Sequence, residues 1–111
     1  MIPTIGRSVV EAFYTTGYND IVDASTVVSL HDGFVGSGSW NEFLPGKPNI
    51  LMDTHHYEVF DSGSLGMSPD AHVSSACSFG AGIATNTKST ISGEWTSSVT
   101  GMSRLSPSHT C

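Results

Sequence analysis

The sequence predicts an α/β fold built on a parallel sheet, and two observations support this prediction. Short apolar or β-branched runs alternate with segments of helical character, in the order helix, strand, loop, strand, helix, strand. Such alternation is typical of parallel strands joined by crossover connections. Polar residues also follow each of the three expected strands, at the end where parallel strands carry their functional groups: His31 and Asp32, His55 to Tyr57, and Glu94.

The first helix is expected over residues 8–24, although Gly17 weakens its middle. Residues 26–30, Thr-Val-Val-Ser-Leu, are β-branched and predict the first strand. Glycine and proline residues from Gly36 to Pro45 then mark a loop. The prediction of the helix rests on five apolar residues that fall close to one helical face: Val9, Val10, Phe13, Ile21 and Ala24.

The second strand is expected at residues 49–52, a continuous apolar run of the kind found in strands covered on both faces. Ser68 followed by Pro69 supplies a helix N-cap and a favoured first helical residue. The helix that begins there is expected to reach about Ala84. Residues 89–92 predict a third strand, which ends in Gly-Glu-Trp.

Composition excludes several classes of partner. The chain has 111 residues, 38% of them hydrophobic, which is enough for one small globular domain. Its net charge of -6 argues against nucleic acid, whereas a neutral sugar is compatible with it. No run approaches the roughly 18–20 apolar residues that cross a bilayer, so no membrane partner is expected. Residues 1–4 lack the features of a secretory signal, which predicts either a cytoplasmic protein or a missing N-terminus.

Glu94 lies between Gly93 and Trp95, immediately after an expected strand. A carboxylate beside an indole would be partly desolvated, an environment suited to nucleophilic or acid/base work. The alternative is an ordinary glutamate at a strand end, facing water.

His55, His56 and Tyr57 form a polar aromatic cluster whose rings can orient a carboxylate and hydrogen-bond sugar hydroxyls. A metal site that adds His31 and Asp32 is disfavoured, because adjacent histidines on a strand point to opposite faces. The usual spacings of metal ligands are also missing from the sequence. We therefore expect no metal and no cofactor.

Two further groups of residues remain open at this point. Phe34, Trp40 and Phe60 are either core residues or platforms on which sugar rings stack. Cys77 and Cys111 form one disulfide, pair with partners elsewhere, or are unpaired thiols.

Five segments occur in an order that resembles the fungal exo-1,3-β-glucanases of glycoside hydrolase family 5. The likeness covers roughly residues 8–98, and its most specific part is Asp-Thr-His-His-Tyr, whereas Gly-Glu-Trp alone is weak. The five segments are Leu-His-Asp-Gly-Phe at 30–34, Trp-Asn-Glu-Phe at 40–43, Asp-Thr-His-His-Tyr-Glu-Val-Phe at 53–60, Asp-Ala-His-Val-Ser-Ser-Ala-Cys-Ser at 70–78 and Gly-Glu-Trp at 93–95.

The resemblance implies an eight-stranded (β/α)8 TIM barrel, of which residues 1–100 hold about strands five to seven with their helices. Residues 101–111 match nothing in the family. It further implies a secreted or cell-wall glycosidase that releases glucose from the non-reducing ends of β-1,3-glucan, with retention.

Carried over residue by residue, the resemblance assigns Glu94 as the nucleophile. His55 and Tyr57 match catalytic-site residues that orient the nucleophile and contact the sugar, while His56 points away. Three aromatic residues are expected to bind substrate: Phe34, Phe60 and Trp95.

The sequence departs from the family in two places, and both bear on whether the chain holds a complete active site. The family's acid/base is the glutamate of an Asn-Glu-Pro motif, which is absent here, and neither Glu11 nor Glu42 replaces it. The likeness also stops near Thr100, so Cys77 would lack its family disulfide partner. We therefore expect a fragment that is inactive by itself. The alternatives are a non-catalytic carbohydrate-binding remnant and a small domain, or unstable product of a misread gene, without a ligand.

Overall fold

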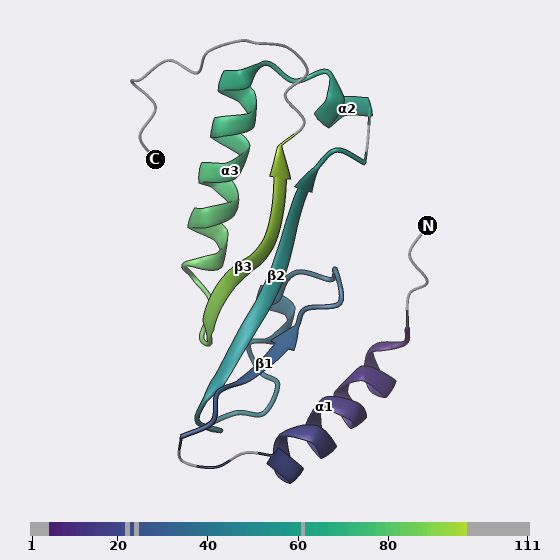
Figure 1. Cartoon of the computed structure of the whole chain (residues 1–111), viewed down its shortest axis with the longest axis vertical. Helices are drawn as coiled ribbons and strands as arrows, with labels where there is room; N and C mark the ends of the chain where they lie inside the picture. Colours follow the sequence, from purple (N-terminus) through teal and green to yellow (C-terminus); the bar gives the residue numbers. More distant parts are fainter. Residues whose placement is uncertain (1–4, 22, 24, 61, 98–111) are drawn as a thin grey trace.

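The computed structural model describes residues 5–21, 23, 25–60 and 62–97. Its three strands form one sheet in the order β1-β2-β3, and both pairs are parallel (Figure 1). The predicted α/β fold with a parallel sheet is therefore confirmed. The elements in chain order are α1 (Arg7–Ile21), β1 (Val28–His31), the 3-10 helix η1 (Ser37–Trp40), β2 (Ile50–Glu58), α2 (Ser62–Leu65), α3 (Pro69–Ile83) and β3 (Ser89–Ser97).

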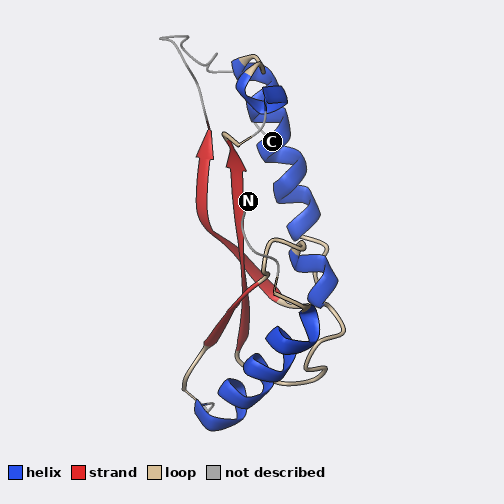
Figure 2. Cartoon of the chain, turned by 90° about the vertical axis from the view of Figure 1, so that its right-hand side faces the viewer, coloured by secondary structure: helices blue, strands red, loops and turns tan. Residues whose placement is uncertain are grey.

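The two long helices lie on the same side of the sheet, and the other side carries no helix in the part of the chain that is described (Figure 2). Successive side chains of a strand point to opposite faces. Leu30 and its partner Met52 face the helices and are buried, whereas His31 and Asp53 face the open side. The expectation that residues 49–52 are covered on both faces therefore does not hold here, because Leu51 is only half-buried.

The core lies between α1, η1 and the helical face of the sheet. Tyr18 and Trp40 contribute its largest rings, and each satisfies its polar atom by donating to a backbone carbonyl oxygen. Tyr18 Oη is 2.8 Å from the carbonyl of Pro48, and Trp40 Nε1 is 2.9 Å from that of Asp32. Trp40 is thus a core residue and no sugar platform. The buried apolar set is Tyr18, Val28, Leu30, Trp40, Ile50 and Met52.

The helix α1 differs from its prediction in the face that it buries. Val9, Phe13 and Ile21 are 62%, 71% and 56% exposed, while the inward stripe contains Tyr14 and Tyr18. Val10, which was predicted to face inward, lies on this stripe and packs against the core. The prediction missed the two tyrosines because it counted only aliphatic residues and phenylalanine. A tyrosine buries its ring and still bonds through its hydroxyl, as Tyr14 Oη does to the carbonyl of His31 at 2.8 Å. Ala24 lies outside the described residues.

The start of α3 follows its sequence signals. The Ala71 amide donates to Ser68 Oγ at 3.2 Å, and Pro69 is the first helical residue. The helix ends at Ile83, one residue before the predicted end. Cys77, on α3, is not a free thiol, which argues against the reading of unpaired cysteines. Cys111 and residues 101–111 lie outside the described part of the chain.

Both longer strands extend past their predicted ends. β2 runs on to Glu58 and β3 to Ser97, so His55, Tyr57 and Glu94 lie within strands rather than in the loops after them. The short helix α2 was not predicted. None of the described helices is long and apolar enough to span a bilayer.

Candidate active site

The open face of the sheet carries a cluster of polar and aromatic side chains near the carboxyl ends of its strands. On β2, Asp53, His55 and Tyr57 are alternate residues and so share this face. His31, the last residue of β1, places its ring 4.3 Å from that of His55, measured between centroids. Glu94 joins them from β3, where it pairs with His55.

A β-bulge puts Glu94 on this face. Thr54 pairs with Ser92 and His55 pairs with Glu94, so β3 has one extra residue, Gly93, between the two pairs. Paired residues of parallel strands share a face, and a shift of one residue exchanges the faces. With an unbroken register Glu94 would pair with His56, on the helical side of the sheet. The bulge places it beside His55 and Tyr57 instead.

Tyr57 and Glu94 are in direct contact. The phenol Oη of Tyr57 donates a hydrogen bond to Glu94 Oε2, and this bond raises the pKa of Tyr57 above its ordinary value. His55 completes the group, with Nδ1 3.2 Å from Tyr57 Oη and 3.9 Å from Glu94 Oε2. A phenol that donates to a carboxylate holds it in one orientation.

Phe34 and Phe60 border this group. The ring of Phe34 meets that of His55 edge-on at 5.8 Å, and the ring of Phe60 meets that of Tyr57 edge-on at 5.3 Å. Phe34 is 48% exposed and Phe60 is 78% exposed, so both present apolar surface to solvent near Glu94. Neither is a core residue.

The backbone at Phe34 is strained, and a buried carboxylate holds it. Its φ of 62° lies in the left-handed region, which a bulky residue rarely adopts. Asp32, which is buried, accepts the Phe34 amide through Oδ1 at 2.9 Å and the Thr54 hydroxyl through Oδ2 at 2.6 Å. The sequence placed Asp32 at the functional end of a strand and as a possible metal ligand, but did not indicate this structural role. No group of three or more His, Cys, Asp or Glu side chains among the described residues is arranged to hold a metal ion.

Trp95 and His56 lie on the opposite face from Glu94. His56 stacks on Phe79 of α3, with ring centroids 4.3 Å apart and planes 22° apart, so it points away from the group as expected. Trp95 pairs with His56 and is 73% exposed. The structure therefore does not bring Trp95 to Glu94. The indole also does not desolvate the carboxylate, because 63% of the Glu94 side chain is exposed.

A second polar group, behind the site, was not foreseen. Glu58 and His72 are buried between β2 and α3, with His72 Nδ1 2.5 Å from Glu58 Oε2. Burial raises the pKa of Glu58, but hydrogen bonds from Ser75, His72 and His56 outweigh it and hold that pKa below its usual range. The sequence indicates this pair only weakly. Glu58 is an alternate residue of β2 on the face toward the helices, and the predicted helix after Ser68 carries His72.

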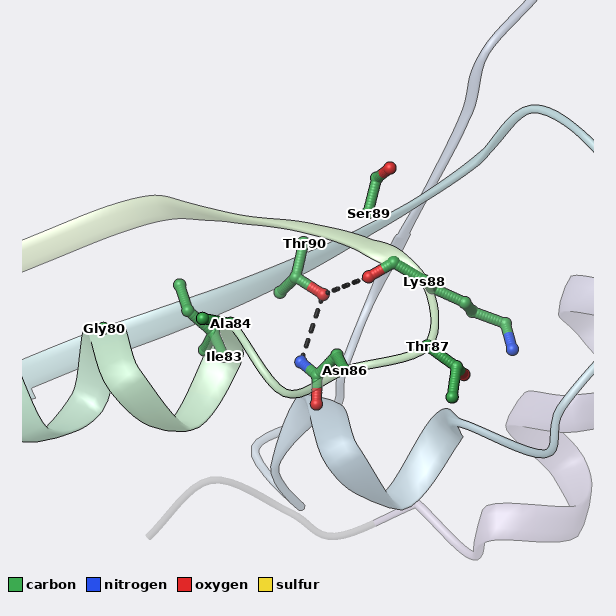
Figure 3. A pocket seen from close by; sticks show the side chains of 8 residues that line it. All are labelled: Gly80, Ile83, Ala84, Asn86, Thr87, Lys88, Ser89 and Thr90. Carbon is green, nitrogen blue, oxygen red and sulfur yellow. Dashed lines mark hydrogen bonds between the residues drawn. The ribbon is translucent and has the colours of Figure 1, made fainter.

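A separate hollow of about 580 Å³ opens at the other end of β3 (Figure 3). It is lined by residues between Gly80 and Thr90, where α3 ends and β3 begins. Within it, the Asn86 amide donates to Thr90 Oγ1, which in turn bonds the carbonyl of Lys88. The amino ends of parallel strands usually serve stability, so the candidate site remains the group around Glu94.

Comparison with known proteins finds fungal relatives over most of the chain. The probable glucan 1,3-β-glucosidase A of Aspergillus fumigatus is 42% identical over 104 residues, which are 88% of this chain and 25% of that protein. The Aspergillus terreus protein of the same name is 40% identical over 90% of this chain and 25% of its own length. The chain is similar to the fungal glucan 1,3-β-glucosidases.

The glucan 1,3-β-glucosidase of Blumeria graminis is 39% identical over 84% of this chain. These matches confirm the resemblance that the order of motifs predicted. The chain spans about a quarter of the length of the glucan 1,3-β-glucosidases that it matches. No protein-family model matches it.

Proposed function

We propose that this chain carries the nucleophile of a retaining exo-1,3-β-glucan hydrolase of glycoside hydrolase family 5. The observation that carries the proposal is the contact between Tyr57 and Glu94, beside His55, near the carboxyl ends of parallel strands. The names of the similar proteins support β-1,3-glucan as the substrate. We also propose an extracellular or cell-wall location.

In this proposal the three strands are the fifth to seventh strands of a (β/α)8 barrel. Such a barrel has parallel strands inside and helices outside, so one face of each strand is covered by helices and the other faces the interior. The one-sided arrangement of α1 and α3 supports this assignment (Figure 2). Asp53, His55, Tyr57 and Glu94 would then point into the mouth of the barrel.

Glu94 attacks the anomeric carbon of the terminal glucose and forms a glycosyl-enzyme, which water then hydrolyses. Tyr57 donates a hydrogen bond to Glu94 and so holds its carboxylate in position. A retaining enzyme also needs a second carboxyl group about 5–5.5 Å away, to protonate the leaving oxygen. Because the sequence contains no Asn-Glu-Pro motif, we assign this acid/base to a segment outside the present chain.

Covalent trapping tests the role of Glu94 without the acid/base. A 2-deoxy-2-fluoro-β-glucoside with a dinitrophenyl leaving group needs no protonation to react. Incubated with the 111-residue chain, it is expected to label the peptide that contains Glu94, as measured by mass spectrometry. Glu94→Gln should abolish the label and Glu42→Gln should retain it. A label on any other carboxylate would refute the assignment.

The same chain is not expected to hydrolyse laminarin. Loss of general acid catalysis lowers a rate by roughly 10²–10⁴-fold, and an unactivated glucoside depends on it. Measurable release of glucose by the purified chain would contradict this part of the proposal.

A non-catalytic carbohydrate-binding role is the second candidate, favoured by the exposure of Phe34 and Phe60. Sugar rings stack their apolar faces on such side chains. Binding of laminari-oligosaccharides at millimolar concentration, lost in Phe34→Ala and Phe60→Ala, together with no label on Glu94, would favour this role over catalysis.

A further inference from the structure

We propose that Asp53 is a positioning residue that fixes the bulge at Gly93 and thereby decides on which face of the sheet Glu94 lies. The importance of that face for catalysis rests on the proposed function. The structural claim itself concerns only Asp53, Gly93 and Glu94.

A hydrogen bond joins β2 and β3 at the bulge. The amide of Gly93 donates to Asp53 Oδ1 at 2.9 Å. A bulge leaves its extra residue without a partner in the hydrogen-bond ladder of the sheet. A backbone amide without a partner costs free energy unless another group accepts its proton. The Asp53 carboxylate is that acceptor, and its side chain is only 24% exposed.

Asp53 and Gly93 also fit each other in space. The Asp53 carboxylate occupies the volume in which a β-carbon on Gly93 would stand, since both of its oxygens and its carbon would overlap that position. Any other residue at 93 would push the carboxylate away from the amide. The two positions therefore fit each other: the glycine makes room, and the aspartate fills that room and bonds the backbone.

The bulge changes the register between β2 and β3. Before the bulge Thr54 pairs with Ser92, and after it His55 pairs with Glu94. If the bulge were lost, Glu94 would pair with His56 and turn toward α3, and Trp95 would take its place beside Tyr57. The bulge thus exchanges an indole for a carboxylate on the open face.

Asp53 also reaches the catalytic group directly. Its second oxygen, Oδ2, lies 3.4 Å from Nε2 of His55. One carboxylate therefore bonds the bulge through one oxygen and contacts His55 through the other. Asp53 therefore connects the bulge next to Glu94 with the ring of His55.

The ionisation of Tyr57 reports whether Glu94 is in place, because their hydrogen bond is the main cause that raises the Tyr57 pKa. The chain has three tyrosines, so 13C-tyrosine NMR of the 111-residue chain has only three tyrosine signals to follow, and Tyr57→Phe identifies that of Tyr57. Asp53→Ala should lower the Tyr57 pKa about as far as Glu94→Gln does. In the Asp53→Ala background, Glu94→Gln should then add no further shift.

Asp53→Asn is the matched control. It keeps an oxygen acceptor for the Gly93 amide but removes the negative charge, which itself contributes a small rise to the Tyr57 pKa. We expect Asn to preserve most of the elevation that Ala abolishes. The proposal is overturned if Glu94→Gln shifts the Tyr57 pKa equally in the wild-type and Asp53→Ala backgrounds, since Glu94 would then have stayed in contact.

Gly93→Ala provides a second route if Asp53→Ala does not fold, as judged by circular dichroism. It should also lower the Tyr57 pKa, and adding Asp53→Ala should recover part of the stability that Gly93→Ala loses, because the overlap is relieved. Additive losses of stability would contradict the proposed fit. Neither measurement requires hydrolysis, so Asp53 can fail this test while Glu94 is labelled by the fluoroglucoside, and the reverse.

Discussion

Nδ1 of His72 lies 2.5 Å from Oε2 of Glu58, and this contact joins α3 to the end of β2 where both side chains are at most 5% exposed. The same carboxylate accepts from Nε2 of His56 at 3.1 Å through its other oxygen. Glu58 follows Tyr57 directly and faces the opposite way. The residue that holds the candidate nucleophile is therefore supported from behind by a buried polar network.

Glu58→Ala should destabilise the chain by about 3–5 kcal/mol, because it leaves the buried His72 without its partner. Chemical denaturation in urea measures the change. Glu58→Gln retains the shape and an acceptor and should cost less than Ala. Equal stability of the wild type and Glu58→Ala would show that the network contributes nothing.

The stability conferred by Glu58 should depend on pH in a defined direction. Because its pKa is held below the usual range in the folded chain, the ionised form contributes stability above its unfolded value of about 4.3. That contribution is lost as pH falls through the lower, folded pKa. The difference in free energy of unfolding between wild type and Glu58→Gln should therefore shrink as pH falls below about 4.3.

Asp23 is the control for the loss of stability at low pH that we assign to Glu58. Hydrogen bonds from Ser25 and Thr26 lower the pKa of the exposed Asp23 to about 2. Asp23→Asn should leave the pH dependence of the Glu58→Gln difference unchanged, because the two carboxylates share no partner.

If the difference in free energy of unfolding between wild type and Glu58→Gln grew toward low pH, the Glu58 pKa would be raised in the folded chain and not lowered.

The two tryptophans should respond very differently to truncation. Trp40 is 1% exposed in the core, so Trp40→Ala should cost about 3–5 kcal/mol. Trp95 is 73% exposed, and Trp95→Ala should change stability by no more than about 0.5 kcal/mol. Denaturation midpoints of the two variants provide the comparison. A large loss for Trp95→Ala would mean that the Trp95 side chain itself is packed.

Two substitutions of Phe34 should differ in stability but not in their loss of affinity for sugar. Its positive φ costs an L-residue about 1 kcal/mol relative to glycine. Phe34→Gly should therefore be about 1 kcal/mol more stable than Phe34→Ala, while both lose affinity for laminari-oligosaccharides to the same extent. Calorimetric titration and urea unfolding of both variants test this. Unchanged affinity in both would remove Phe34 from the substrate-binding surface.

Short sequence patterns were enough to predict some structural elements correctly but not others. Ser68 and Pro69 act on the backbone next to them, so the start of α3 could be read directly. The buried face of α1 was predicted only at Val10, because Tyr14 and Tyr18 were left out of the hydrophobic pattern although they bury their rings. The parallel order of the strands followed from alternation alone.

The candidate site was predictable as a list of residues but not as an arrangement. His55, Tyr57 and Glu94 were identified from motifs, and the structure brings these three together. Trp95 was expected beside them and lies on the other face. That outcome depends on a bulge whose acceptor, Asp53, is 40 residues away from Gly93, and no short pattern in the sequence encodes such a contact.

The order β1-β2-β3 leaves only β2 paired on both sides, so β1 and β3 are the edges of the described sheet. Unpaired edges accept whichever strand reaches them first. Folding then competes with aggregation, because strands of the same polypeptide must pair with these edges before strands of another molecule do. We expect the yield of soluble chain to fall steeply with its concentration during refolding, and to recover when polypeptide that supplies neighbouring strands is present from the start.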